Sequence, residues 1–564
     1  MNFKDFKYYR PNIQEYQKQL SELLEEFNNA DNVDKQIELI KTINKARNTI
    51  STMATLSSIR HSINTKDEFY DQENDFWDYS GPLVSEIDFN FQKALVNSKF
   101  LPQLKKHFPS QWFTLIDLSL KSFDPQVITE LQEENKLSSE YAKLSASAEI
   151  SFEGKIYNLS QMTPFTLVND REKRKAATLA KDQFFLDNQA KFDEIYDKLV
   201  KVRDKIAKKL GYKNFVELGY LRMGRSDYNA NDVGNYRKQV LESLVPLTTN
   251  LYKKQQKRLA YDKLFYYDEK IEFLSGNPTP KGTAEQLVKA AQKMYQKISP
   301  ETNEFFNFML DNNLMDLLAK EAKQGGGYCT YLPDYRSPFI FANFNGTSHD
   351  VDVLTHEAGH AFQSYMSRDI EIPDLAWTTM EAAEIHSMSM EFFAHPYMKE
   401  FFKEDTEKYY YYHIVDALKF IPYGVCVDHF QHFVYENPNV SPAERKAKWR
   451  ELEKLYLPHK NYQGNTLLEN GGWWYRQAHI FEAPFYYIDY TIAQICALQF
   501  YARSLDDYSG TWLDYLELCK VGGTKSFLGL LQQCNLQSPF INGTIKKTVE
   551  RILPELDKID DSRF

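Results

Sequence analysis

The pentapeptide HEAGH at residues 356–360 is the feature that most restricts how this chain can fold. Its two histidines are four residues apart, so in an α-helix they lie on one face, one turn apart. Two imidazoles placed in this way can bind one Zn²⁺ ion, and Glu357 can then act as general base toward a water on the open side of the metal. The motif therefore predicts a helix that carries a catalytic zinc site, with His356 and His360 as ligands.

The residues around the motif favour a helix at this position. Thr347, Ser348 and Asp350 are typical of a helix start, and Thr347 with Asp350 has the spacing of a capping box. Apolar residues then recur at helical spacing, at Val351, Leu354, Ala358 and Phe362. Since the chain has only 12 histidines in 564 residues, a chance match to the motif in a helical context is uncommon.

A tetrahedral catalytic zinc site needs a third protein ligand. Residues 381–391 contain no Pro or Gly and read as a helix, and spacing alone leaves four of them open as ligands: Glu381, Glu384, His386 and Glu391. Glu384 and Glu391 are seven residues apart, two turns along one face, which suits one ligand with a second carboxylate beside it. Asp352, one turn before His356, is a further candidate to accept the spare N–H of a metal-binding histidine.

Two segments resemble a known family. HEAGHAFQSY (356–365) and EAAEIHSMSMEFF (381–393) are similar to the thimet oligopeptidase and neurolysin family of zinc peptidases, and most similar to its oligoendopeptidase F and Pz-peptidase branch. That family takes its third ligand from a Glu that is followed by Ser three residues later and by Glu seven residues later. Glu384, Ser387 and Glu391 reproduce this pattern, so the resemblance selects Glu384 as the zinc ligand.

The resemblance implies a mainly α-helical, bilobed metallopeptidase with a deep channel and a small β-sheet next to the helix of the HEAGH motif. It implies an oligoendopeptidase that hydrolyses internal bonds of short unfolded peptides and holds one Zn²⁺ ion per chain. Two alternatives stay open: a zinc exopeptidase of the dipeptidyl carboxypeptidase type, and a non-catalytic peptide-binding homologue. The intact Glu357 argues against the second, since an inactive homologue need not keep its base.

An aromatic run follows His479. Pro484 suits the first turn of a helix, in which Tyr486 and Tyr490 would lie one turn apart on the same face. The resemblance places a histidine and several tyrosines of this region over the substrate, where their donors would stabilise the oxyanion. His479, Tyr486 and Tyr490 are therefore expected to be catalytic, with Tyr487 as the alternative to Tyr486.

Residues 324–345 interrupt the helical pattern. The glycines at 325–327 lack the lysine and hydroxyl residue of a phosphate loop, and they would instead let another chain approach closely. Residues 338–344 read as a strand, and an exposed edge there could bind an extended peptide as an added strand. Substrate contacts are therefore expected at Gly326, Gly327, Phe341, Ala342 and Asn343.

Helical periodicity dominates the rest of the chain. Residues 13–29 and 33–63 form an expected antiparallel helix pair, helices continue through 64–146, a β-hairpin is expected at 149–159, and helix returns over 171–210. We expect an N-terminal mainly helical region at 1–200 and a catalytic region at 201–564, with lobes that interleave because no flexible linker separates them.

Composition excludes several classes of protein. The net charge of −10 comes from interspersed acidic and basic residues, which argues against a nucleic-acid partner. No run of 18 apolar residues exists, so no membrane-spanning helix is predicted, and the N-terminus has no apolar core of a signal peptide. Five scattered cysteines favour a reducing compartment. We expect a cytoplasmic protein whose partners are short peptides; the sequence predicts no oligomeric state.

Overall fold

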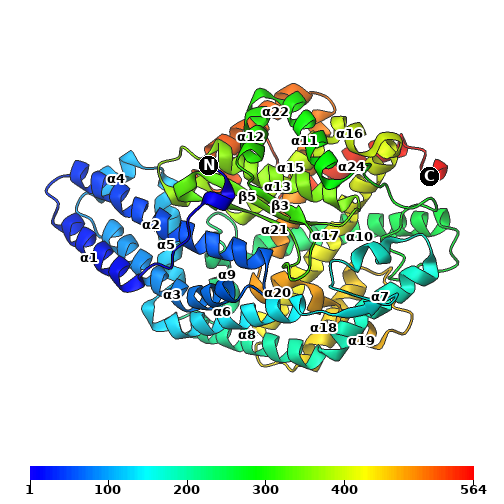
Figure 1. Ribbon diagram of the computed structural model, residues 1–564, viewed down its shortest axis with the longest axis horizontal. Coiled ribbons are helices and arrows are strands. Elements are labelled where there is room, and N and C mark those ends of the chain that lie inside the picture. Colours follow the sequence, from blue (N-terminus) through cyan, green and yellow to red (C-terminus); the bar gives the residue numbers. More distant parts are fainter.

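The computed structural model describes all 564 residues. They form a mainly α-helical molecule with two small sheets, which confirms the predicted fold class. Figure 1 shows an elongated shape, with the first five helices at one end and the helices that carry the candidate site near the middle.

The first five helices form most of a second hydrophobic core, to which Ile372 and Leu375 also contribute. Their bounds are α1 (Ile13–Asn29), α2 (Val33–Ile63), α3 (Glu68–Val96), α4 (Leu101–His107) and α5 (Ser110–Ser122). Leu20, Ile40, Phe91 and Trp112 are buried in this core, apart from the much larger core of the rest of the chain. The predicted pair of helices at 13–29 and 33–63 is confirmed, and α1 packs against α2 as expected.

The segment from α6 to α10 follows the first five helices and packs into the main core. It contains α6 (Ile128–Ala146), β1 (Ile150–Phe152), β2 (Lys155–Tyr157), α7 (Arg171–Asp187), α8 (Gln189–Lys209), α9 (Phe215–Arg222) and α10 (Ala230–Arg258). The predicted hairpin is confirmed, with β1 and β2 antiparallel. The helical structure expected over 171–210 is confirmed, as two helices that are divided at Asn188. The Asn188 side-chain amide donates to the Phe184 carbonyl at 2.9 Å at the end of α7.

The division into domains follows the two cores. The boundary expected between residues 200 and 201 falls inside α8, where Leu199, Val200 and Val202 are all buried in the main core. The separate core of α1–α5 ends instead with α5 at Ser122. We propose that the N-terminal domain ends near residue 123 and that α6–α8 belong to the catalytic part.

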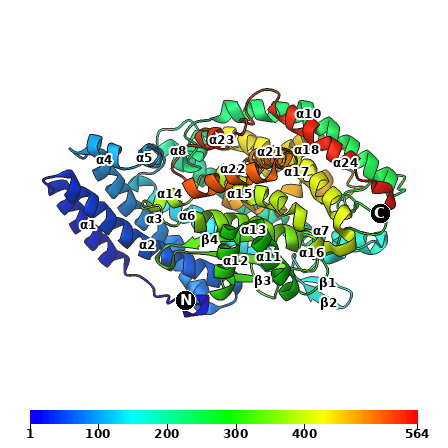
Figure 2. The ribbon, with the colours of Figure 1, turned by 90° about the horizontal axis from the view of Figure 1, so that it is seen from above.

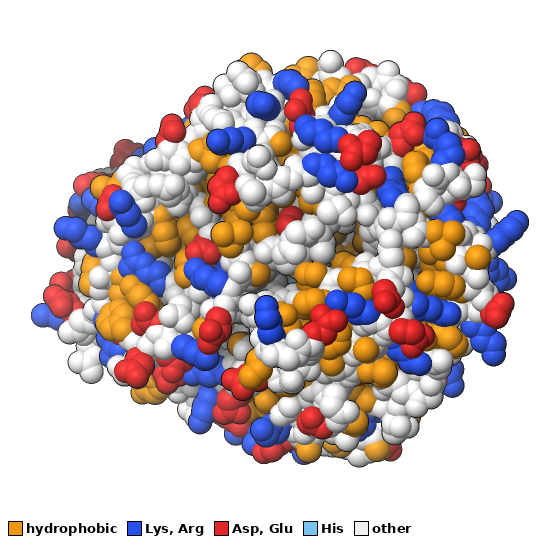
Figure 3. Space-filling model, turned by 45° about the vertical axis from the view of Figure 1, so that its right-hand side comes forward, with side chains coloured by type: hydrophobic (Ala, Val, Ile, Leu, Met, Phe, Trp, Pro, Cys, Tyr) orange, Lys and Arg blue, Asp and Glu red, His pale blue; other side chains and the backbone are white.

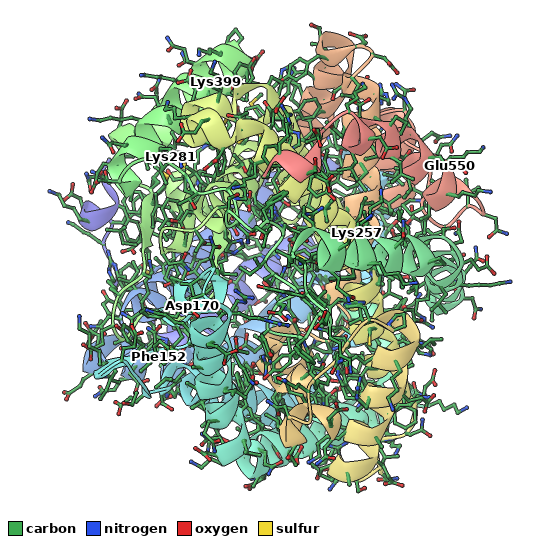
Figure 4. The ribbon with its side chains drawn as sticks, turned by 90° about the vertical axis from the view of Figure 1, so that its right-hand side faces the viewer. Phe152, Asp170, Lys257, Lys281, Lys399 and Glu550 are labelled. Carbon is green, nitrogen blue, oxygen red and sulfur yellow. The ribbon has the colours of Figure 1, made fainter.

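The remaining helices surround the centre of the molecule. They are α11 (Ala284–Ile298), α12 (Pro300–Asp311), α13 (His349–Met366), α14 (Pro373–Ala376), α15 (Met380–Phe393), α16 (Lys399–Phe402), α17 (Thr406–Glu436), α18 (Pro442–Tyr456), α19 (Thr466–Glu469), α20 (Ala478–Glu482), α21 (Tyr487–Ser504), α22 (Tyr508–Val521), α23 (Phe527–Gln533) and α24 (Thr544–Asp557). Both α13 and α21 pack against α15, which makes α15 the central helix of the candidate site. Helices α10 and α24 lie side by side (Figure 2); Figure 4 labels them at Lys257 and Glu550.

A three-stranded sheet lies beside α13, as predicted. It contains β3 (Met315–Leu318), β4 (Tyr328–Leu332) and β5 (Ser337–Phe344), in the order β3-β5-β4. Strand β5 is parallel to β3 and antiparallel to β4, so both of its edges are paired. The expectation that residues 338–344 offer a free edge to a peptide is therefore wrong, because strand order is set by pairing between distant segments. The unpaired edges belong to β3 and β4.

The surface carries charges of both signs. Figure 3 shows acidic and basic side chains mixed over the face that it draws, in keeping with their interspersed order in the sequence. Many form ion pairs one helical turn apart, such as Lys198 with Glu194 at 2.6 Å. None of the helices combines the length and apolar character that crossing a bilayer requires.

Candidate active site

Helices α13 and α15 bring the candidate metal ligands together. The Nε2 atoms of His356 and His360 lie 3.2 and 3.4 Å from Oε2 of Glu384, and the three ligand atoms all lie within 4.8 Å of one another. The two helices approach closely at Gly359, where a Cβ would lie only 2.6 Å from Cα of Ser387. The glycine inside the HEAGH motif therefore lets the third candidate ligand reach the two histidines.

The other residues that spacing left open as ligands face elsewhere. The Glu381 carboxyl is buried, and burial together with the nearby Asp489 raises its pKa to about 8. The Nε2 atom of His386 lies 3.4 Å from the carbonyl oxygen of Leu518. Neither residue joins the group formed by the two motif histidines and Glu384.

The donor set fits a zinc ion. Two imidazole nitrogens and one carboxylate oxygen are donors that zinc accepts, and three protein ligands leave a fourth position for a water or substrate. Burial alone would raise the pKa of Glu384, but the His360 and His356 rings hold it well below its ordinary value. Burial raises the pKa of the adjacent Glu357 carboxyl, and its Oε2 atom has no hydrogen-bond partner. Glu357 is thus a buried carboxyl whose Oε2 atom is free to accept a proton.

The start of α13 differs from the sequence prediction. Its N-cap residue is Ser348, whose side chain makes no capping hydrogen bond. The Asp350 carboxylate instead accepts from the backbone N–H groups of Asn345 and Gly346 at 2.9 and 2.8 Å. The expected capping box of Thr347 and Asp350 is therefore wrong, and Asp350 ties the preceding loop to the helix.

One of the two carboxylates expected behind the ligands lies there. Oε1 of Glu391 is 2.7 Å from Nδ1 of His356, which orients the ring so that its Nε2 faces Glu384. The Asp352 carboxylate instead accepts from the Tyr409 hydroxyl at 2.7 Å. The expected contact between Asp352 and a metal-binding histidine is wrong in this structure, because Glu391 occupies the only spare nitrogen of His356.

Sequence reasoning missed His413 on α17. Its Nε2 atom lies 2.7 Å from Oε2 of Glu391, and its Nδ1 atom lies 2.8 Å from Nε2 of His395. A buried chain of hydrogen bonds therefore runs from His356 through Glu391 and His413 to His395. No local spacing links these residues, so no signal in the sequence could have found His413.

A second chain of hydrogen bonds fixes the proton on His479. Burial lowers the pKa of His479 to about 4, so the ring is neutral. The Tyr423 hydroxyl donates to the side-chain oxygen Oε1 of Gln477 at 2.8 Å. The side-chain nitrogen Nε2 of Gln477 donates to Nδ1 of His479 at 2.9 Å. With the Gln477 amide in this orientation, the His479 proton is on Nε2, which lies 3.1 Å from the Tyr490 oxygen and donates to it. This leaves the Tyr490 O–H free to donate to a ligand.

Tyr486 faces the candidate metal ligands instead. Its hydroxyl donates to Oε1 of Glu384, and burial raises the pKa of this phenol well above its ordinary value. Tyr486 precedes α21, which begins at Tyr487. Pro484 therefore lies in the turn before the helix and not in its first turn, contrary to the prediction.

The turn that places Tyr486 is held from several sides. Phe485 has a φ of +66°, in the left-handed region that a bulky residue adopts only when its surroundings enforce it. Arg225 donates to the Phe485 carbonyl at 2.6 Å, and Gln431 accepts from its N–H at 3.1 Å. The phenyl ring packs on Gly219, where a Cβ would lie 2.5 Å from it.

A cavity of about 430 Å³ adjoins these residues, and we call it the central cavity. Its lining includes Gly327, His356, Glu357, Glu391, His479, Tyr487 and Tyr490. Of the expected peptide-binding residues, only Gly327 lines it, and a Cβ there would lie 3.4 Å from Oε1 of Glu357.

The other expected peptide-binding residues support the glycine segment. Phe341 and Ala342 are fully buried in the sheet. The Asn343 amide donates to the carbonyls of Gln324 and Gly326 at 2.8 Å, so it holds the loop in place. Gly326 has a φ of +88°, a backbone conformation that favours glycine over residues with a Cβ atom. These residues shape the wall and do not face the central cavity.

Comparison with known families agrees with this geometry. Residues 165–549 match the model of Peptidase family M3, and residues 3–123 match the Peptidase M3 N-terminal domain. The chain belongs to peptidase family M3. This confirms the family predicted from the segments 356–365 and 381–393. The N-terminal match of this M3 chain also coincides with the separately packed helices α1–α5.

Similar proteins and structures cover much or all of this M3 chain. An oligoendopeptidase F homolog of Borreliella burgdorferi is 23% identical over 382 residues, which are 65% of this chain and 62% of that protein, less than two thirds of its length. The structure of Pz peptidase A with an inhibitor is 53% identical, covers 100% of both chains and has a TM-score of 0.99. The crystal structure of an oligoendopeptidase F candidate from Bacillus anthracis (strain Ames) is 52% identical, covers 100% of this chain and 99% of that chain, and has a TM-score of 0.94.

Proposed function

We propose that this M3 family protein is a zinc-dependent oligoendopeptidase that hydrolyses internal bonds of short unfolded peptides. The observation that carries the proposal is the grouping of His356, His360 and Glu384 with Glu357 at the wall of a cavity. The similarity to Pz peptidase A and to an oligoendopeptidase F homolog supports the same reaction class.

Each residue of the group has a chemical role in this proposal. His356, His360 and Glu384 would hold one Zn²⁺ ion, which supplies Lewis acidity that polarises a peptide carbonyl and lowers the pKa of water toward about 7. Glu357 takes a proton from the attacking water and later delivers it to the leaving amine. The unpartnered Oε2 of Glu357 and its raised pKa suit both transfers.

The oxyanion donor is assigned to Tyr490, and His479 is assigned to orienting the Tyr490 hydroxyl. Both line the central cavity, and the Gln477 amide keeps the His479 proton on Nε2. When a carbonyl oxygen develops negative charge there, the Tyr490 O–H can donate to it without further rearrangement. Tyr486 has its hydroxyl on Glu384, so we assign it to holding the third metal ligand.

Peptide binding is assigned to the unpaired edge of β4. Cys329, Thr330 and Tyr331 of this strand line a cavity of about 580 Å³ against α2 and α3, while Gly327 just before the strand lines the central cavity. An extended peptide that adds to β4 would pass both cavities, with its backbone hydrogen bonded to the strand. This replaces the edge of β5, which is paired on both sides.

Metal removal tests the proposal directly. Treatment with a chelator should abolish hydrolysis of an internally quenched peptide, because no thiolate or other residue in the group could replace the metal's Lewis acidity. Adding Zn²⁺ should restore the rate, and Co²⁺ should restore part of it, since its ligand preferences are similar. Bound metal would be measured by elemental analysis, and full activity in a metal-free sample would refute zinc dependence.

Products from an end-blocked peptide separate endopeptidase from exopeptidase activity. A peptide with an acetylated N-terminus and an amidated C-terminus should still be cut at internal bonds, which mass spectrometry would locate. An exopeptidase would need a charged anchor for a free terminus, so blocking the ends should stop it. Loss of cleavage on blocking would favour that alternative.

The tyrosines can be told apart by kinetics. Tyr490→Phe should lower kcat by about 10²–10³-fold with little change in KM, because it removes a donor that acts mainly in the transition state. Tyr487→Phe is the matched control: Tyr487 lines the same cavity but packs edge-on against Phe420 and Tyr423. Equal kcat values for both variants and the wild type would remove Tyr490 from the mechanism. Zinc content would be measured in each variant.

A further inference from the structure

We propose that Glu482 forms a subsite for a positively charged group of the substrate, in a polar cavity next to the central cavity. This subsite rests on the proposed peptidase function. Glu482 ends the short helix α20, which also carries His479. The cavity has a volume of about 260 Å³, and its mostly polar wall includes Ser58, Asn74, Ser139 and Gln324. We call it the Glu482 cavity.

Two segments connect the Glu482 cavity with the central cavity. On α20, His479 lines the central cavity and Glu482, three residues later, lines the other. Along the glycine segment, Gly327 lines the central cavity and Gln324 lines the other. Three residues rise about 4.5 Å in a helix and span at most about 10 Å along any chain. The Glu482 cavity is therefore within reach of a substrate group about three residues from the cleaved bond.

The far wall of the Glu482 cavity comes from the N-terminal half of the chain. Helices α2, α3 and α6 contribute it, through residues such as Ser58, Asn74 and Ser139. Helix α6 also packs against α20, and Figure 1 shows the two helices as neighbours below the centre of the molecule. A substrate in this cavity would thus contact both parts of the chain.

The Glu482 carboxylate makes no ion pair or hydrogen bond within the protein. The nearby Arg203 guanidinium is bound to Glu134 at 2.6 Å, so it is not available to pair with Glu482. Glu482 is exposed on the cavity wall, so its carboxylate is open to a ligand, and a cation placed against it would form charge-assisted hydrogen bonds. The side chain thus offers an open place for an ammonium or guanidinium group.

The other ionisable groups of the cavity leave its charge negative. Lys143 Nζ lies 3.0 Å from Asp71 and 3.3 Å from Asp75, so its charge is already balanced. Burial lowers the pKa of His61, which keeps that ring neutral near pH 7. A cation is therefore favoured over an anion, and in a peptide it would be a Lys or Arg side chain or the free α-amino group.

Peptide binding to the inactive Glu357→Gln variant tests the subsite without turnover. Peptides of one neutral sequence would carry a single Arg, or citrulline as its uncharged analogue, at each of three positions on either side of the cleaved bond. Each would be made with a free and with an acetylated N-terminus. At one position the Arg peptide should bind about 10- to 100-fold more tightly than the citrulline peptide, or the peptide with a free N-terminus should exceed its acetylated form by the same factor. Calorimetry would measure the affinities.

Removing the carboxylate should remove only that preference. Glu357→Gln/Glu482→Gln should bind charged and uncharged peptides equally, with the affinity for the uncharged ones unchanged. The matched control is Glu357→Gln/Glu133→Gln, which removes an exposed carboxylate of α6 outside the cavity and should keep the preference. Dependence on Arg identifies a side-chain subsite, and dependence on the free terminus identifies an α-amino subsite; both support a cation at Glu482.

Two results would overturn the subsite: equal binding of every charged and uncharged pair, or a preference that survives Glu482→Gln. Hydrolysis by the wild-type chain is scored separately. A Glu482-dependent preference without any hydrolysis would keep the subsite and refute the proposed peptidase function. Hydrolysis without the preference would do the reverse.

Discussion

Replacing Glu357 by Gln should lower kcat by about 10²–10⁴-fold while bound zinc and peptide affinity stay close to wild type. The amide has nearly the same shape as the carboxylate but cannot accept the proton of the attacking water. Glu357 is not one of the three clustered ligand residues, so its loss should not release the metal. The measurements are kcat with an internally quenched peptide, zinc by elemental analysis and the peptide Kd.

A neighbouring carboxylate provides the control for Glu357. Asp352 lines the same cavity but accepts a hydrogen bond from Tyr409 and contacts neither motif histidine. Asp352→Asn should therefore keep kcat within about tenfold of wild type, below the usual contribution of a general base. A Glu357→Gln variant as active as Asp352→Asn would show that another group moves the proton.

Replacing Glu384 by Gln should weaken metal binding by more than about 100-fold, since even residues behind the ligands usually contribute 10–100-fold. The amide oxygen is a weaker donor than a carboxylate, and the negative charge that balances the metal is lost. Activity should fall with zinc content and recover in part at high Zn²⁺ concentration. Dialysis against a metal buffer, followed by elemental analysis, measures the affinity.

Glu381 is the matched control for Glu384, since it lies one turn earlier on α15 and is equally buried. Its carboxyl lies near Asp489 and Arg225 and apart from the histidine pair, so Glu381→Gln should retain zinc. If Glu381→Gln loses zinc and Glu384→Gln keeps it, the third ligand has been assigned to the wrong residue.

Some parts of the candidate site could be predicted because they are local. The i,i+4 spacing of His356 and His360 fixes two nitrogens on one helical face wherever that helix lies. The spacing of Glu384 and Glu391 acts in the same way along α15. Asp352 shows the limit of this reasoning. Its spacing from His356 is suitable, but its carboxylate accepts a hydrogen bond from Tyr409, which lies 57 residues later in the chain.

The sequence by itself determined the mainly helical fold and the HEAGH motif, because periodicity and motif spacing act over a few residues, and two of its segments carried the resemblance to the family. Only the tertiary structure decided which side chains meet. Gly359 lets α13 and α15 approach, β3 and β4 cover both edges of β5, and Gln477 sets the proton of His479. These contacts join segments whose separation along the chain carries no information about their distance in space. They depend on how whole helices pack, so the sequence indicates the candidate ligands but not the residues that orient them.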